Sequence, residues 1–153
     1  MTAAVQLFPA QPRPDLAIRR IVLATDLAPA SECAAAQALA LASDLHAEIL
    51  AVSVIDPAAH DSGPSLRMDQ RRAALEVAAQ ALVVRGRRQG VTVQFLVWEG
   101  EPGPSIVDAA EAEQADLIVV GTRGRSRVER MVLGSVSDHV VRHTHCPVLV
   151  VRT

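Results

Sequence analysis

The sequence predicts a three-layer α/β domain, in which helices cover both faces of an open parallel sheet. Short apolar runs recur along the chain and alternate with longer segments whose apolar residues repeat with a helical period. This alternation is typical of βαβ units, and runs that are apolar throughout indicate strands buried on both faces. The expected strands are residues 21–24, 49–54, 91–97, 117–120 and 148–151.

The first two helices are expected over residues 31–45 and 66–88. Apolar side chains on one stripe of each should face the sheet, because a surface helix buries one face. In the first helix the stripe comprises Ala34, Ala35, Ala38, Leu41, Ala42 and Leu45, and in the second it comprises Ala74, Val77, Ala78, Ala81 and Val84. The second helix should stop near Arg88, because basic residues before a glycine, here Gly90, are a helix stop signal.

Two shorter helices complete the pattern. One is expected over residues 104–114, with Pro104 in its first turn, and the other over 134–145, stopped by Pro147. The connection 56–64 is rich in turn-forming residues and is expected to be a flexible loop. Residues 1–18 contain three prolines and no sustained periodicity, so we expect a flexible arm followed by one domain over 19–153.

The composition argues against several classes of function. The net charge is −2, and no long run of one sign is present, which argues against nucleic acid or an anionic membrane as a partner. The chain has no lysine, so a Schiff base or a Walker-type phosphate lysine is impossible. Two cysteines do not form a disulfide framework, and no apolar run approaches about 18 residues, so a cytoplasmic protein is expected.

A glycine motif follows the fourth expected strand. Gly121 and Gly124 are separated by two residues, and nine further residues lead to Gly134 and Ser135. Glycines allow backbone amides to approach a ligand closely, and successive N–H groups in such turns can hold an anion. The helix expected to begin at Gly134 would add its unsatisfied N–H groups. The spacing therefore predicts a phosphate-binding loop.

Together with the segments 21–26, 51–56 and 146–151, this motif closely resembles the universal stress protein family over residues 19–152. In that family the motif marks the members that bind ATP. The resemblance implies the strand order 3-2-1-4-5, an adenine nucleotide carried with or without Mg²⁺, and a homodimer paired through the strand 148–151. It also implies a stress-response or signalling role.

The site implied by the resemblance combines an adenosine side with a phosphate side. Asp26 would accept hydrogen bonds from ribose hydroxyls or the adenine amine, although an Asx turn or a helix cap is the alternative. Val54 would contact adenine, and Arg123 and Arg125 would bind phosphate unless they are only solvated loop charges. The complete set is Ala24, Thr25, Asp26, Val54, Val120, Gly121, Arg123, Gly124, Arg125, Gly134, Ser135 and Val136.

No catalytic residues and no protein metal site are predicted. His143, His145 and Cys146 do not present ligands from one helix face, and nothing in the sequence completes a tetrahedral set. Glu99, Glu101 and Asp108 could meet a Mg²⁺ carried with ATP, but solvated loop charge is the simpler interpretation. Slow ATP hydrolysis or autophosphorylation is the most chemistry that we expect.

Two departures from the family pattern affect the adenosine side. Ala24 replaces a proline often found two residues before the aspartate, and Leu27 and Ala28 replace small polar residues that commonly follow it. The sequence therefore leaves two alternatives to ATP binding. The chain could be a dimeric interaction module of the same fold that does not depend on ATP, or it could prefer AMP, a cyclic nucleotide or another adenine nucleotide.

Overall fold

A computed structural model describes residues 17–58, 66–122 and 133–152, and places five strands in one parallel sheet. The strand order is β3-β2-β1-β4-β5, which confirms the expected order. The strands are β1 (Arg20–Ala24), β2 (Glu48–Ile55), β3 (Val93–Glu99), β4 (Leu117–Gly121) and β5 (Val148–Val151). Residues 1–16 of the expected arm (1–18) and most of the expected loop (56–64) lie outside the described residues, whereas Ile18 is described and packs against the core.

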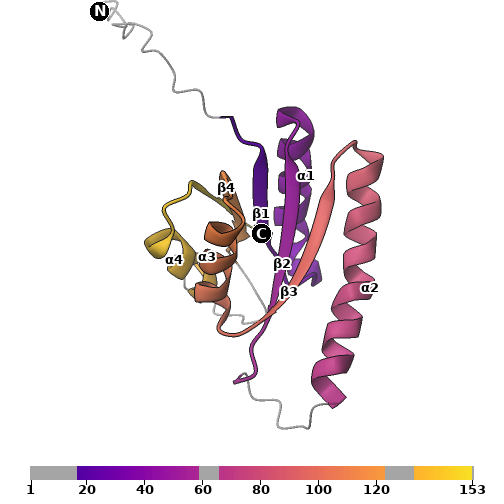
Figure 1. Ribbon diagram of the computed structural model, residues 1–153, viewed down its shortest axis with the longest axis vertical. Helices are drawn as coiled ribbons and strands as arrows, with labels where there is room; N and C mark the ends of the chain where they lie inside the picture. The colour runs from indigo at the N-terminus through magenta and orange to yellow at the C-terminus, as the bar shows by residue number, and fades with distance from the viewer. Residues whose placement is uncertain (1–16, 59–65, 123–132, 153) are drawn as a thin grey trace, which may run out of the picture.

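Four helices lie on the two faces of the sheet (Figure 1). On one face are α1 (Glu32–Leu45), which follows a short 3₁₀ turn η1 (Pro29–Ser31), and α2 (Leu66–Arg88); on the other are α3 (Pro102–Ala112) and α4 (Ser135–His143). Helices on both faces explain why the strands are apolar on both sides. The α/β prediction is therefore confirmed, including all five strands and four helices.

The sheet separates two apolar cores. In β1, Ile21 and Leu23 pack with α1, whereas Val22 between them packs with α3 and α4. Successive side chains of a strand point to opposite faces, so one short strand contributes to both cores. All three side chains are fully buried.

The predicted helix faces are only partly correct. In α1, Leu39 is buried and Leu45 is 42% exposed. In α2 the predicted stripe is wrong: Val77 is 75% exposed and Val84 is 43% exposed, whereas Ala79 and Leu82 are buried. Apolar residues fill two neighbouring stripes of α2, and both fit the period of a helix. Packing against the sheet, which periodicity does not specify, selects the stripe that is buried.

The helix ends also shift slightly. The third helix begins at Pro102, two residues before the expected start, and the fourth runs from Ser135 to His143 with Gly134 as its N-cap. Element boundaries are the least certain part of a sequence pattern. In the described part of the chain, no helix is long and apolar enough to cross a membrane.

Candidate functional site

The candidate site lies where β1 and β4 run side by side and end. These strands are neighbours and parallel, with Ile21 opposite Leu117, and their last residues are Ala24 and Gly121. The chain leaves β1 toward α1 on one face and leaves β4 toward α4 on the other. Ligands of open α/β sheets bind at such a switch point, outside the carboxyl ends of the strands.

Asp26 forms a turn after β1. Its Oδ1 accepts hydrogen bonds from the Ala28 N–H at 2.9 Å and from the Ser31 hydroxyl at 2.5 Å. The Leu27 N–H donates to Thr25 Oγ1 at 3.0 Å. The turn interpretation of Asp26 is therefore realised. The other oxygen, Oδ2, accepts no hydrogen bond from the described residues, so it can accept one from a ligand.

Leu27 adopts a left-handed backbone conformation within this turn, with φ of 57°. That conformation costs a side-chain-bearing residue about 1–2 kcal/mol. Its side chain packs against the core beneath α1, which offsets part of this cost. A residue where the family usually has a small polar side chain thus anchors the loop by apolar contact.

Thr25 fixes the end of β1 to β2. Its N–H donates to the Val52 carbonyl at 3.0 Å, and its own carbonyl accepts the Ser53 hydroxyl at 2.5 Å. Ser53 is buried, so this bond is shielded from water. Sequence reasoning missed Ser53 and Ser31. A lone hydroxyl within the apolar run of β2 was the signal that could have found Ser53.

Four predicted site residues meet on one face of the sheet, that of α3 and α4. Val120 is buried in the core there, and Ala24, Val54 and Val136 are half-buried against the same core. They come from β1, β2, β4 and α4, four separate parts of the sequence. The structure therefore supplies an apolar surface beside the end of β1, of the kind that a base ring can contact.

Gly134 brings the start of α4 against the end of β4. Its φ is −70°, so a left-handed conformation does not explain the glycine. Instead, a Cβ at this position would lie 2.7 Å from the Thr122 carbonyl oxygen. Gly134 has no side chain to cap the N-terminus of α4, none of the described side chains caps it, and Ser135 is exposed there. The first-turn N–H groups are consequently suited to an anion.

The remaining phosphate-side residues, Arg123, Gly124 and Arg125, lie outside the described residues. The structure describes the two ends of that loop, Thr122 and Leu133, and no part between them. Thr122 is held in place by its N–H, which donates to the Val151 carbonyl at 2.9 Å. Whether the arginines face the site stays a prediction.

The carboxylates considered for Mg²⁺ lie at the end of β3 (Glu99), at the N-cap of α3 (Glu101) and within α3 (Asp108). Glu99 forms an ion pair with Arg72 at 2.8 Å, and Glu101 and Asp108 are exposed. Within residues 17–58, 66–122 and 133–152, no group of three or more His, Cys, Asp or Glu side chains is placed to hold a metal ion. His139 and His143 stack on α4 with ring centroids 4.0 Å apart.

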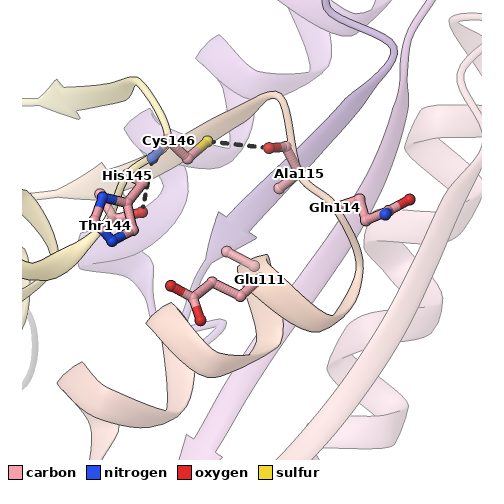
Figure 2. A pocket seen from close by; sticks show the side chains of 7 residues that line it. Glu111, Gln114, Ala115, Thr144, His145 and Cys146 are labelled. Carbon is pink, nitrogen blue, oxygen red and sulfur yellow. Dashed lines mark hydrogen bonds between the residues drawn. The ribbon is translucent and has the colours of Figure 1, made fainter.

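A cavity of about 230 Å³ lies at the other end of the strands, next to the starts of β4 and β5 (Figure 2). It is formed between the end of α3, including Glu111, and the segment before β5, including His145 and Cys146. The Cys146 thiol donates to the Ala115 carbonyl at 3.3 Å. Burial, and the nearby Asp116 carboxylate, raise the pKa of the Cys146 thiol, which disfavours a nucleophilic role.

The fold is that of an open α/β domain, a class in which ligands commonly bind at the carboxyl ends of the central strands. The model of the universal stress protein family matches residues 17–152. The chain belongs to the universal stress protein family.

Individual relatives span most of the chain. A universal stress protein of Methanocaldococcus jannaschii is 34% identical over 139 residues, covering 88% of this chain and 82% of the relative. A solved structure of a family protein from Burkholderia pseudomallei has a TM-score of 0.74 at 28% identity, covering 90% of this chain and 98% of that one. A universal stress protein solved in complex with cAMP has a TM-score of 0.71 at 25% identity, covering 88% and 97%.

Proposed function

We propose that this stress-response protein binds ATP at the carboxyl ends of β1 and β4, and that the bound nucleotide controls a surface read by a partner. The observation that carries the proposal is the contact of Gly134 with Thr122. It places the uncapped N-terminus of α4 against the end of β4, the strand next to β1 and Asp26. The N-terminus of α4 can bind an anion, and Asp26 can accept a hydrogen bond. Both thus lie at the strand ends beside one apolar surface.

In this proposal the two halves of ATP meet different groups. Asp26 Oδ2 accepts a hydrogen bond from the ribose or adenine, and the base lies against Val54 and its neighbours. The triphosphate is held by backbone N–H groups of the glycine loop and α4, with Arg123 and Arg125 adding charge. A Mg²⁺ would arrive with the nucleotide. No residue is assigned as a catalytic base, so the role is binding.

A second candidate is an adenine nucleotide with fewer phosphates. It is favoured by one observation: a relative of similar fold was solved in complex with cAMP. The adenosine half of the site would serve AMP and ATP alike, because Asp26 and Val54 are remote from the 5′ phosphates in this scheme. In cAMP the phosphate also joins the ribose 3′ oxygen, so Asp26 could accept a hydrogen bond only from the 2′ hydroxyl or the adenine amine. In this scheme the glycine loop determines how many phosphates the bound nucleotide carries.

We also propose that the protein is a cytoplasmic homodimer paired through β5. The carbonyls of Pro147 and Val151 accept hydrogen bonds from the N–H groups of Ile118 in β4 and of Thr122, the residue after β4. Backbone groups alternate in direction along a strand, so those of Val148 and Val150 face away from β4, and no described strand pairs with them, which suits pairing with a second copy. Both cysteines are free thiols, as is usual in a reducing compartment.

The nucleotide can be identified directly. Purified protein is denatured, and the released small molecules are separated and weighed by mass spectrometry. ATP in amounts approaching one per chain supports the proposal, whereas AMP or cAMP supports the second candidate. If nothing is released, titration calorimetry with ATP, AMP and cAMP follows. Absence of binding for all three would favour an interaction module that does not depend on a nucleotide.

A further inference from the structure

Ser31 occupies the N-cap of α1 but does not cap the helix. An N-cap serine usually accepts a hydrogen bond from an N–H in the first helical turn. Here the Ser31 side chain makes no such bond; its backbone is helical at φ −89° and ψ −3°, and its hydroxyl donates to Asp26 Oδ1 instead. A residue type that normally stabilises a helix is thus directed at the proposed ligand-binding carboxylate.

The contact is short and protected. The distance of 2.5 Å lies in the range of a hydroxyl that donates to an ionised carboxylate. Ser31 is buried at 7% exposure, and its own N–H donates to the Ala28 carbonyl at 2.9 Å. Backbone and side chain of Ser31 are both held, so the hydroxyl forms a fixed support for Asp26.

The two oxygens of Asp26 consequently have different roles. Oδ1 receives both internal hydrogen bonds, from Ser31 and Ala28, and Oδ2 receives none from the described part of the chain. The two hydrogen bonds to Oδ1 restrict the rotation of the Asp26 carboxylate. We propose that Ser31 is a positioning residue, which fixes the Asp26 carboxylate so that Oδ2 is already placed for the nucleoside half of the ligand.

This inference rests on the proposed function, because it assigns Asp26 to the adenosine side. Immobilising a side chain on binding costs about 0.5–1.5 kcal/mol, which corresponds to about a twofold to tenfold change in affinity. A carboxylate that is fixed before binding avoids that cost. Loss of the Ser31 hydroxyl should therefore raise the dissociation constant by about this factor, and only for ligands that reach Asp26.

The test uses three probes on the full chain: ATP, adenosine and inorganic tripolyphosphate, measured by titration calorimetry. Ser31→Ala should weaken the affinity for ATP and for adenosine by the same factor and leave the affinity for tripolyphosphate unchanged. Ser31→Thr, which keeps the hydroxyl, should restore binding. Ser43→Ala is the matched control, because Ser43 lies on the same helix and bonds only the remote Gln89 carbonyl, at 3.3 Å.

A double-mutant cycle separates positioning from general damage. In an Asp26→Ala background, Ser31→Ala should cause no further loss, because the carboxylate that it orients is gone. An equal loss in both backgrounds, or an equal loss for tripolyphosphate, would overturn the inference. If the parent binds nucleotide and Ser31→Ala binds as tightly, only the positioning role fails. If the parent binds neither ATP nor adenosine, the proposed function fails, and this role fails with it.

Discussion

Replacing Gly134 with alanine tests the phosphate side of the site at a described position. The new Cβ would lie 2.7 Å from the Thr122 carbonyl oxygen, whereas a relaxed carbon–oxygen contact is about 3.3 Å or longer. The start of α4 must therefore move away from β4 by about half an ångström or more. Overpacking of this kind costs about 1–3 kcal/mol of stability.

The displacement should also weaken ATP binding, by a free energy of the same order as its cost in stability. The N–H groups at the start of α4 would no longer reach the phosphate at hydrogen-bonding distance. A hydrogen bond to a charged group contributes about 1.5–3 kcal/mol, so the loss of one predicts at least about a tenfold weaker affinity. Adenosine, which has no phosphate, should keep its affinity. Titration calorimetry with both ligands, beside urea denaturation, measures the two effects.

Gly90→Ala provides the matched control. Gly90 has φ of 72° and nothing within 4 Å of an added Cβ, so alanine there costs about 1–2 kcal/mol through the backbone alone. It follows α2, away from the strand ends that form the site. The control should lose stability and keep ATP. If a folded Gly134→Ala variant binds ATP as tightly as the parent, the assignment of α4 to the phosphate is refuted.

Three further outcomes are expected. Changing Arg123 and Arg125 together to glutamine should weaken ATP binding about tenfold to a hundredfold and leave adenosine binding unchanged. The change should also reduce the salt dependence of ATP binding, which calorimetry at two salt concentrations measures. Equal losses of affinity for ATP and for adenosine would instead indicate a folding defect. Val150→Pro removes an N–H that faces away from β4, so light scattering should report a monomer, and an unaffected dimer would contradict pairing through β5. Because the pKa of the Cys146 thiol is raised, iodoacetamide at pH 8 should alkylate the exposed Cys33 first, as peptide mass mapping would show.

Strands were easier to predict than helix faces. A strand buried on both sides needs only an apolar run, and all five runs became strands of the sheet. A helix has to choose one face, and α2 offers two. Val77 and Leu82 belong to different stripes, and only contact with the sheet decides that Leu82 is buried while Val77 remains exposed. That contact depends on tertiary packing, which a single sequence does not contain.

The site shows the same division between local and tertiary information. The glycine motif predicted that Gly134 permits close approach, but the partner of that approach is the chain's own Thr122 carbonyl. Nothing in the sequence relates the two residues except the fold. Ser31 was equally hidden, because the sequence predicted it only as the first residue of a helix over 31–45. Its hydroxyl instead donates to a carboxylate five residues earlier.

For Asp26, the turn and the binding interpretations are compatible. A turn needs one acceptor, and Oδ1 supplies it to Ala28 and Ser31. Ligand binding needs a second acceptor, and Oδ2, which accepts no hydrogen bond from the described residues, can supply it. The turn is also what holds the carboxylate at the end of β1, so removing the turn would weaken binding even with Asp26 intact. The departures at Leu27 and Ala28 fit this arrangement, since Leu27 anchors the loop in the core and Ala28 contributes only backbone groups, its N–H to Asp26 and its carbonyl to the Ser31 N–H. Ser31 then provides the side-chain hydroxyl bound to the carboxylate, and under the proposed function it is this hydrogen bond that positions Asp26 for adenosine.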